Sequence, residues 1–333
     1  MLNEGLGARG RRFGYVFVSA TLLLTVVLVV YSWTSPALSS TSSDSFLHAP
    51  EIVVFQPVAE VVKWPIWEGT DLERLAPRIT GPRGSKPRVR ALLTIPIGKK
   101  SVDIVNGTIY SFLNSGAGRV MLFAYDSFDW SSQKWYNDER VILVRHLKQM
   151  KWWFIKRFVT PLTVEPYDYL WFSDDDASFS WNPHEFMDLL DAHQVELAQP
   201  SHFTHQPCAP SGWPIAHHRS TQNGGGINGR WTNFVECGPL AIVKKTLWKQ
   251  CLWNFLQDDL TSGYGLDELW HDACKAKSAI IDKYPMCHNS TKAASSASTR
   301  IYDPVLEWPE YGKRFPHLKK SPNDPLKNFI GTF

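Results

Sequence analysis

Short apolar runs alternate with amphipathic stretches from residue 89 to residue 282, and this alternation limits the folds that the chain can adopt. Apolar runs bounded by Gly, Pro or Asp are typical of buried strands, whereas apolar residues spaced three and four apart are typical of helices. On these patterns we expect strands over 89–97, 119–125, 167–172, 195–198 and 278–282, with a strand pair or a strand and a turn over 234–243. We expect helices over 103–113, 139–158, 183–193 and 244–260.

Strands that alternate with helices predict an α/β fold, in which a mostly parallel sheet lies between two layers of helices. The carboxyl ends of parallel strands lie at one edge of such a sheet, and ligands bind beyond that edge. We therefore expect the functional residues to come directly after the strands.

Three consecutive carboxylates, Asp174, Asp175 and Asp176, come shortly after the apolar run of residues 167–172. Adjacent carboxylates repel one another, so three of them at the end of a buried strand require a positive counter-charge. Side chains alternate in extended backbone, which places Asp174 and Asp176 on the same side. Carboxylate oxygens are ligands that Mg²⁺ and Mn²⁺ prefer, and we favour a divalent metal site here over a solvated acidic turn.

Two further segments carry residues suited to a site of this kind. His288 comes six residues after Asp282, where the last predicted strand ends, although a lone His is more often a hydrogen-bonded residue than a ligand. The segment 263–268 puts Asp267 on a glycine-containing loop, where a carboxylate can act as a general base. A helix with Asp267 and Glu268 in its first turn explains the same residues almost as well.

Basic and aromatic residues are interleaved over 151–158, KWWFIKRF. Phosphate binding is one interpretation, but a helix with a buried aromatic face and Lys and Arg side chains that extend to water is the better one. The glycines at 224–226 form a loop or a backbone cradle for an anion. The sequence has no GxxxxGK[ST] or GxGxxG motif, so ATP-type and dinucleotide sites are not supported.

The segment 13–33 contains no charged residue and is long enough to cross roughly 30 Å of hydrocarbon as a helix. Three Arg residues come shortly before it, and no Lys or Arg follows until Lys63. The positive-inside rule then predicts a cytosolic tail over 1–12 and a body on the other side of the membrane. Because the apolar run exceeds the core of a cleaved signal peptide, about 7–15 residues, we prefer an uncleaved signal anchor to a cleaved signal.

Serine and proline are frequent after the anchor, which predicts a flexible stem over 34–88 followed by one luminal domain over 89–333. In that compartment Asn106 and Asn289 are glycosylation acceptors, because each begins an Asn-x-Thr sequon. The 5 Cys all follow the anchor, so an oxidising lumen predicts at least one disulfide and an odd thiol. With 35 Lys plus Arg against 32 Asp plus Glu, a nucleic-acid partner is not expected.

The motifs between residues 89 and 290 follow one another in a characteristic order. They are KWWFIKRF, YDYLWFSDDD, Gln199-Pro200, His217-His218, Phe234-Val235-Glu236, Trp248 with Cys251 and Trp253, Gln257 to Leu260, GYGLD, Cys274 and the stretch from Asp282 to His288. As a set they resemble the plant and fungal family called domain of unknown function 707. That family is in turn similar to nucleotide-sugar glycosyltransferases of the GT-A type.

The resemblance implies a GT-A-like, Rossmann-like domain in which an acidic strand-end motif holds Mn²⁺ or Mg²⁺ and the diphosphate of a nucleotide sugar. By that resemblance Asp174, Asp176 and His288 would ligate the metal. Asp175 would contact the donor sugar, and Asp267 would be the base on the acceptor hydroxyl. The family usually has Trp-Asp-Glu-Asp at this motif, so the shorter middle acid of this chain affects the donor contact more than the metal.

The resemblance also implies roles for residues around this motif. The turn from Pro96 to Gly98 would face the nucleotide base. The diphosphate would be reached by Lys151, Lys156 or Arg157. Cys251 and Cys274 match cysteines of the family and would form a disulfide.

These inferences predict a type II membrane glycosyltransferase of the Golgi or ER, with its catalytic domain in the lumen. It would transfer a sugar from a nucleotide sugar to a hydroxyl of a glycan or glycoconjugate, with a divalent metal. One alternative is a metal-dependent luminal hydrolase that uses the same acids and needs no acceptor. The other is a non-catalytic carbohydrate-binding or scaffold protein that retains the fold.

Overall fold

The structure is a computed structural model, and all of its described residues belong to one compact unit over 53–333. The described residues are 61–63, 89–203, 207–208, 227–257, 263–289, 309, 312–319, 321 and 329–333. The predicted cytosolic tail, the predicted anchor and the glycines at 224–226 lie outside them. Within the described ranges, no helix has both the length and the apolar character needed to cross a membrane.

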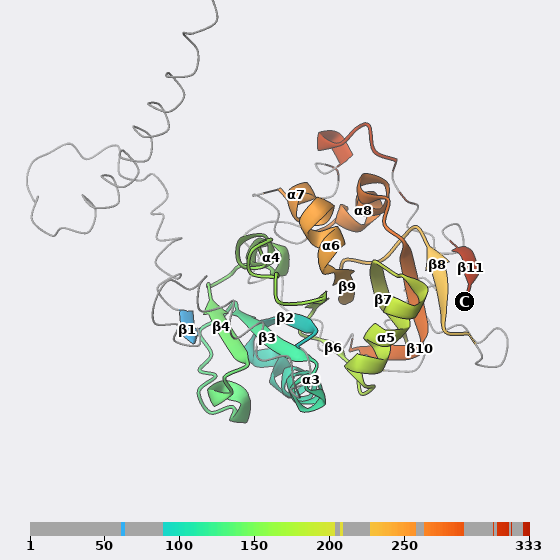
Figure 1. Ribbon diagram of the computed structural model, residues 1–333. Helices are drawn as coiled ribbons and strands as arrows, with labels where there is room; N and C mark the ends of the chain where they lie inside the picture. The colour runs from blue at the N-terminus through green and yellow to red at the C-terminus, as the bar shows by residue number, and fades with distance from the viewer. Residues whose placement is uncertain are drawn as a thin grey trace, which may run out of the picture. The chain divides into compact units, whose positions relative to one another are not determined.

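A mixed and mostly parallel sheet forms the centre of this unit (Figure 1). Its strands, in spatial order, are β1 (Val61–Lys63), β4 (Val141–Arg145), β3 (Gly118–Ala124), β2 (Ala91–Ile97), β5 (Tyr169–Ser173), β9 (Leu240–Lys244), β7 (Leu197–His202), β10 (Ser278–His288), β8 (Gly229–Thr232) and β11 (Phe329–Thr332). Strands β4, β3, β2 and β5 are parallel neighbours, as are β7 and β10, and β9 runs antiparallel between β5 and β7. The carboxyl ends of six strands therefore point to one edge of the sheet.

Helices cover both faces of the sheet, as the alternation predicted (Figure 1). One layer contains α3 (Val102–Ser115) and α5 (Pro183–His193). The other contains α4 (Lys151–Phe158), α6 (Lys245–Leu247), the π-helical turn η5 (Trp248–Leu252), α7 (Trp253–Phe255) and α8 (Leu266–Cys274). Two short 3₁₀ helices, η2 (Lys99–Ser101) and η3 (Lys134–Asn137), lie in the connections.

Two apolar clusters, one on each face of the sheet, hold the layers together. Successive side chains of a strand point to opposite faces, so Trp171 and Phe172 of β5 contribute to different clusters. Trp171 makes an edge contact with Phe112 of α3 at 5.5 Å between ring centroids. Phe172 packs on Trp248 at 4.8 Å on the other face. Aromatic side chains thus bury β5 on both sides.

Some of the predicted elements are confirmed and others are wrong. The predicted helices over 103–113 and 183–193 are α3 and α5, and Asn182 caps α5 by accepting a hydrogen bond from the amide of His184. The predicted helix over 139–158 is wrong, because its first part is strand β4 and only its last turns form α4. A run of β-branched and leucine residues, VILV, favours the strand, and Lys148 has a φ of 64°, which no helix accommodates.

The remaining boundaries also differ from the prediction. The helix expected over 244–260 ends at Phe255, because Leu256 is extended, and it contains the π-helical turn. Over 234–243 the structure has one strand, β9, preceded by an irregular segment with a cis Gly238–Pro239 bond, which fits the strand-and-turn alternative and not the strand pair. The last predicted strand extends to His288 instead of ending at Asp282. Part of the predicted stem forms β1, which pairs with β4 at the edge of the sheet.

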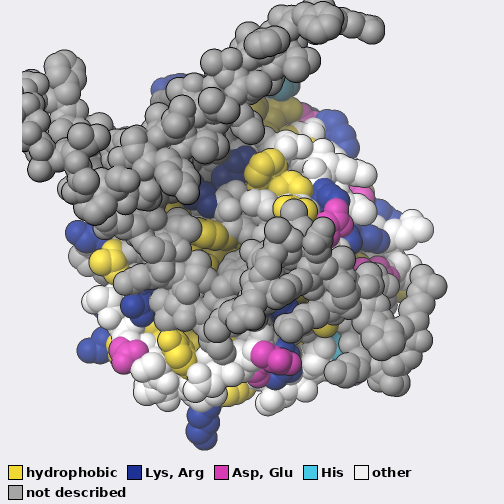
Figure 2. Space-filling view, turned by 60° about the vertical axis from the view of Figure 1, so that its left-hand side comes forward, with side chains coloured by type: hydrophobic (Ala, Val, Ile, Leu, Met, Phe, Trp, Pro, Cys, Tyr) yellow, Lys and Arg dark blue, Asp and Glu magenta, His cyan; other side chains and the backbone are white. Residues whose placement is uncertain are grey.

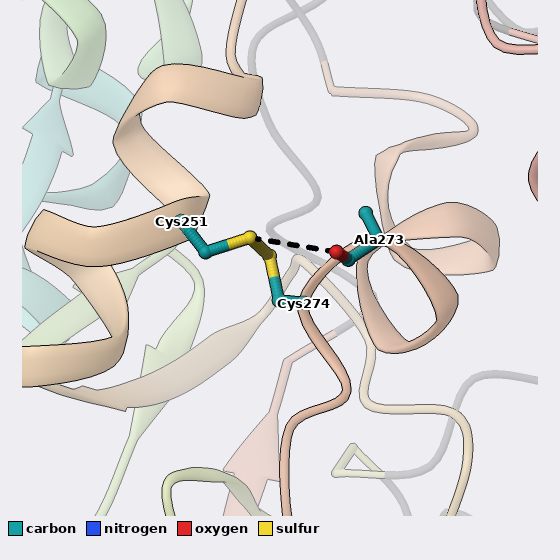
Figure 3. Close-up of a disulfide and its surroundings, with 3 residues drawn as sticks. All are labelled: Cys251, Ala273 and Cys274. Atoms are coloured by element: carbon teal, nitrogen blue, oxygen red, sulfur yellow. Dashed lines mark hydrogen bonds between the residues drawn. A yellow bond between two sulfur atoms is a disulfide. The ribbon is translucent and has the colours of Figure 1, made fainter.

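Two disulfides are formed, and Cys237 is a buried free thiol. The predicted pair, Cys251 and Cys274, is confirmed and joins the π-helical turn η5 to the last residue of α8 (Figure 3). The second pair, Cys208 and Cys287, was not predicted. It attaches the chain beyond β7 to the end of β10, next to His288.

Candidate functional site

The end of β5 meets the end of β10 through a short antiparallel bridge. Strand β6 (Ala177–Ser178) pairs with β10, and His288 lies opposite Ala177. The amide of Asn289 donates a hydrogen bond to the backbone oxygen of Asp176 at 2.8 Å. This pairing brings the third acid of the 174–176 motif beside a histidine that is more than a hundred residues away in sequence.

Asp176 and His288 face one another across this bridge. The Nε2 atom of His288 lies 3.2 Å from Oδ1 of Asp176, and their side chains are only 12% and 6% exposed. Among the described residues, no donor forms a hydrogen bond to this buried Oδ1 atom. A buried carboxylate oxygen that faces an imidazole nitrogen in this way requires a proton or a cation between them.

Asp174, at the same strand end, is paired with a lysine. Its Oδ1 lies 2.6 Å from Nζ of Lys151, the first residue of α4, and Lys151 also donates to the backbone oxygen of Cys237 at 2.9 Å. The amide of Asp174 donates to the oxygen of Pro239 at 2.6 Å. A Cβ atom on Gly238 would lie 2.6 Å from Oδ2 of Asp174, so any larger residue there would force the carboxylate to move. Burial raises the pKa of Asp174, and the ammonium of Lys151 only partly offsets that effect.

Asp175 points away from these two acids and into the sheet edge. Its Oδ2 atom accepts hydrogen bonds from Ser101 Oγ and from Tyr125 OH, both at 2.6 Å. Burial raises the pKa of Asp175 to about 7, although both hydrogen bonds act in the opposite direction. Asp175 thereby connects the end of β5 to the turns that follow β2 and β3 by hydrogen bonds, and these bonds hold the end of β5 in place.

A second acidic pair, Asp267 and Glu236, lies near Lys151. Oδ2 of Asp267, in the first turn of α8, accepts a hydrogen bond from the amide of Cys237 at 3.2 Å. Burial raises the pKa of Asp267 to about 6. The neighbouring Glu236 has a pKa well above its usual range, first because it is buried and then because of the charges of Asp267 and Asp174.

The segment 236–239 connects these groups. The backbone oxygen of Cys237 accepts a hydrogen bond from Lys151, and its amide donates one to Asp267. The backbone oxygen of Pro239 accepts a hydrogen bond from the amide of Asp174. Gln199 of β7 holds its start by accepting from the amide of Glu236 at 2.6 Å. The structure therefore brings His288 to the acidic motif and links the motif to Asp267 through this segment. Asp267 lies in the first turn of α8, as the helix alternative predicted.

Other predicted site residues have different surroundings. Pro96 is a buried residue of β2, and Gly98 lies against the ring of Tyr125 so closely that a Cβ atom would overlap it at 2.3 Å. Lys156 lies over the ring of Trp253 at 4.0 Å and donates to its backbone oxygen. The predicted role of Lys156 on a diphosphate is therefore not supported by its contacts.

The guanidinium of Arg157 is also turned to a neighbouring ring. It lies 4.2 Å from the ring centre of Trp153 and donates to the backbone oxygen of that residue. Lys156 and Arg157 belong to the last turn of α4, whereas Lys151 begins it at the end that contacts Asp174. Of the three basic residues predicted for the diphosphate, only Lys151 lies at the site.

The two predicted glycosylation acceptors also differ. Asn106 lies inside α3, where its amide donates to Gln133 and its oxygen accepts from Trp135. Thr108 of the same sequon is buried and donates to the oxygen of Ala177. These contacts argue against a glycan on Asn106 in the folded domain. Asn289 directly follows His288, and the rest of its sequon lies outside the described residues.

Sequence reasoning missed four contributors to this site: Glu236, Ser101, Tyr125 and the Cys208–Cys287 disulfide. Glu236 and the two hydroxyls come from loops after different strands. The signals were the motif Phe234-Val235-Glu236 and the position of Tyr125 at the end of a predicted strand. The balance of 35 Lys plus Arg against 32 Asp plus Glu is also seen on the surface. Figure 2 shows Lys and Arg interspersed with Asp, Glu and apolar side chains over the described part of one face.

In the described part of the chain, no three His, Cys, Asp or Glu side chains are grouped as a complete metal site. Asp176 and His288 contact each other, but the carboxylate of Asp174, the third proposed ligand, is paired with Lys151 instead.

Comparisons with known proteins give a family and weak structural likenesses. No curated protein sequence matches the chain. The protein described as A197 from STIV is similar over 60% of this chain and 85% of its own, with 11% identity and a TM-score of 0.34. HddC from Yersinia pseudotuberculosis is similar over 59% of this chain and 92% of its own, with 12% identity and a TM-score of 0.39. The model of the family described as "Protein of unknown function (DUF707)" matches residues 68–308, well over half of the chain, and the chain therefore belongs to that family.

Proposed function

We propose that this chain is a metal-dependent glycosyltransferase, which transfers a sugar from a nucleotide sugar to the hydroxyl of a glycan or glycoconjugate. The observation that carries the proposal is the contact between Asp176 and His288, with Asp174 at the same strand end. These residues lie at the carboxyl edge of a mostly parallel sheet, where such folds bind their ligands.

The side chains at this edge fit a divalent cation. Oδ1 of Asp176 is buried without a hydrogen-bond donor among the described residues, and it faces an imidazole nitrogen. Carboxylate oxygen and imidazole nitrogen suit Mn²⁺, and carboxylates alone suit Mg²⁺. When bound, such an ion neutralises the charge that develops on a leaving diphosphate. Asp174, Asp176 and His288 would hold it.

The second acidic pair fits the acceptor side of a transfer reaction. Asp267 has a pKa of about 6, so it is largely deprotonated at neutral pH and can take the proton of an acceptor hydroxyl. The amide of Cys237 fixes its Oδ2 atom. Glu236 is the neighbouring acid, and its pKa is raised well above its usual range, first by burial and then by the charges of Asp267 and Asp174.

The proposed location is the lumen of the Golgi or ER, with the segment 13–33 as a single membrane anchor. Two disulfides within the described residues support an oxidising compartment, because such bonds are rare in the cytosol. With a cytosolic N-terminal tail, the catalytic domain would lie in the lumen and act on glycans there.

The test is to incubate the purified full-length protein with Mn²⁺ and a panel of nucleotide sugars, with and without glycan acceptors. Release of the nucleoside diphosphate that depends on the acceptor and is abolished by EDTA supports a transferase. Asp176→Asn should abolish this release. Glu139→Gln, which changes an exposed acid ahead of β4 at the opposite edge of the sheet, should not.

Release without any acceptor would instead indicate a hydrolase. Glycan binding that is insensitive to EDTA, without release or nucleotide-dependent thermal stabilisation, would indicate a binding protein. Either result would overturn the proposed transferase activity.

A further inference from the structure

We infer that Lys151 acts as an internal cation that occupies Asp174 until a nucleoside diphosphate draws it away, so that metal and nucleotide bind cooperatively. This inference rests on the proposed function, because it concerns the same metal site. It assigns Lys151 a positioning role in controlling when that site is complete.

Lys151 is placed as a buried counter-ion and not as a surface lysine. Its side chain is only 8% exposed. Its Nζ atom lies 2.6 Å from Asp174 Oδ1, 2.9 Å from the oxygen of Cys237 and 5.6 Å from the ring centre of Trp152.

This ion pair competes with a metal for one of its three proposed ligands. With Lys151 on Asp174, only Asp176 and His288 remain together at the strand edge. The Asp174 side chain is 33% exposed, whereas that of Lys151 is buried, so the cost of separating the pair falls mainly on the ammonium, which is left uncompensated. A metal that takes Asp174 must therefore displace the ammonium from the carboxylate that it contacts at 2.6 Å.

A nucleoside diphosphate supplies that partner. Phosphate oxygens accept strong charge-assisted hydrogen bonds from lysine, and the flexible four-carbon stem lets the ammonium move. Lys151 is also the first residue of α4, and the N-terminal end of a helix favours an anion. A diphosphate would thus release Asp174 to the metal, and by linkage the metal would strengthen binding of the nucleotide to the same degree.

The experiment measures Mn²⁺ affinity of the full-length protein by the EPR signal of free Mn²⁺, first with Mn²⁺ alone and then with saturating UDP or GDP. In the wild type we expect at least one of the two nucleotides to raise the Mn²⁺ affinity by about 5–150-fold, the usual range of coupling between sites. Lys151→Gln keeps a donor for the Cys237 oxygen but carries no charge. It should bind Mn²⁺ alone at least about fivefold more tightly than the wild type and lose most of the nucleotide effect.

Lys245→Gln is the matched control. Lys245 also pairs with a carboxylate, that of Glu165, and donates to a backbone oxygen, but it lies at the opposite edge of the sheet because β9 is antiparallel to β5. This variant should show wild-type Mn²⁺ affinity in both conditions.

The outcomes separate this inference from the proposed function. If Asp176→Asn binds Mn²⁺ as the wild type does, the metal site itself is refuted. If Asp176→Asn loses Mn²⁺ while Lys151→Gln binds Mn²⁺ alone no more tightly than the wild type, only the inference about Lys151 is refuted.

A second variant covers the case in which Lys151→Gln does not fold. Lys151→Arg retains the charge and offers a two-pronged contact to the carboxylate, so it should bind Mn²⁺ alone more weakly than the wild type. Equal or tighter binding by this variant would overturn the inference.

Discussion

The two disulfides should affect stability by similar amounts but affect the proposed metal site very differently. Cys208 and Cys287 are 79 residues apart, and Cys251 and Cys274 are 23 apart. The loop-entropy relation assigns about 4.5 kcal/mol to the first bond and about 3.4 kcal/mol to the second at 25 °C. Replacing both cysteines of a pair with alanine should therefore lower the free energy of unfolding by these amounts.

The difference of about 1 kcal/mol is more reliable than either value, because the constant part of the relation cancels. The measurement is urea unfolding followed by tryptophan fluorescence, with the two double variants compared under identical conditions. Mn²⁺ affinity is then measured on the folded variants. Loss of the Cys208–Cys287 bond should weaken Mn²⁺ binding about tenfold or more, as is usual when groups that support a ligand are removed, because Cys287 directly precedes His288.

The Cys251–Cys274 pair serves as the control, because it joins η5 to the end of α8 and contacts none of the proposed metal ligands (Figure 3). Its removal should leave Mn²⁺ affinity unchanged. Equal losses of Mn²⁺ affinity in the two variants would refute the reasoning that the Cys208–Cys287 bond positions His288. A larger loss of stability from the shorter loop would refute the entropic estimate.

Three further predictions concern other parts of the site. Tyr125→Phe removes a hydroxyl that donates to a buried carboxylate, and should lower the free energy of unfolding by about 1.5–3 kcal/mol in urea; no change would contradict the support role of that contact. A general base acts when it is deprotonated, and burial raises the pKa of Asp267 to about 6. The transfer rate should therefore fall about tenfold per pH unit below pH 6 and level off above it. A rate that does not change between about pH 4 and 6 would exclude Asp267 as the base. Gly263→Ala should cost more than about 1–2 kcal/mol, because Gly263 has a φ of 84° and a Cβ atom there would lie 2.3 Å from the ring of Trp152. Gly107→Ala, in open space, should not destabilise.

The general fold could be predicted because local patterns and layer packing agree over most of the domain. The apolar face of α3 and the Asn-Pro start of α5 are signals that the tertiary structure preserves. The helix predicted over 139–158 was wrong because the apolar residues of β4 and of α4 together mimic the spacing of a single helix. The φ of Lys148, which separates them, has no signature in the sequence.

The acids of the site could be predicted because they follow strands, but their partners could not. Lys151 meets Asp174 because α4 begins at the edge of the sheet where β5 ends, and Glu236 arrives through the segment before β9. Such contacts depend on crossovers between elements and not on spacing along the chain. The pairing of Cys208 with Cys287 has the same origin, because five cysteines allow several connectivities.

Anomalous X-ray scattering from Mn²⁺, in crystals of the protein grown with Mn²⁺ and the nucleotide it binds, tests the central claim most directly. We expect one strong peak at the carboxyl end of β5, with protein ligands from Asp174, Asp176 and His288 at roughly 2.0–2.3 Å. Lys151 should then be turned from Asp174 towards the diphosphate. A peak elsewhere, or nucleotide bound at this edge with Lys151 still on Asp174 and no metal between Asp176 and His288, would contradict the account.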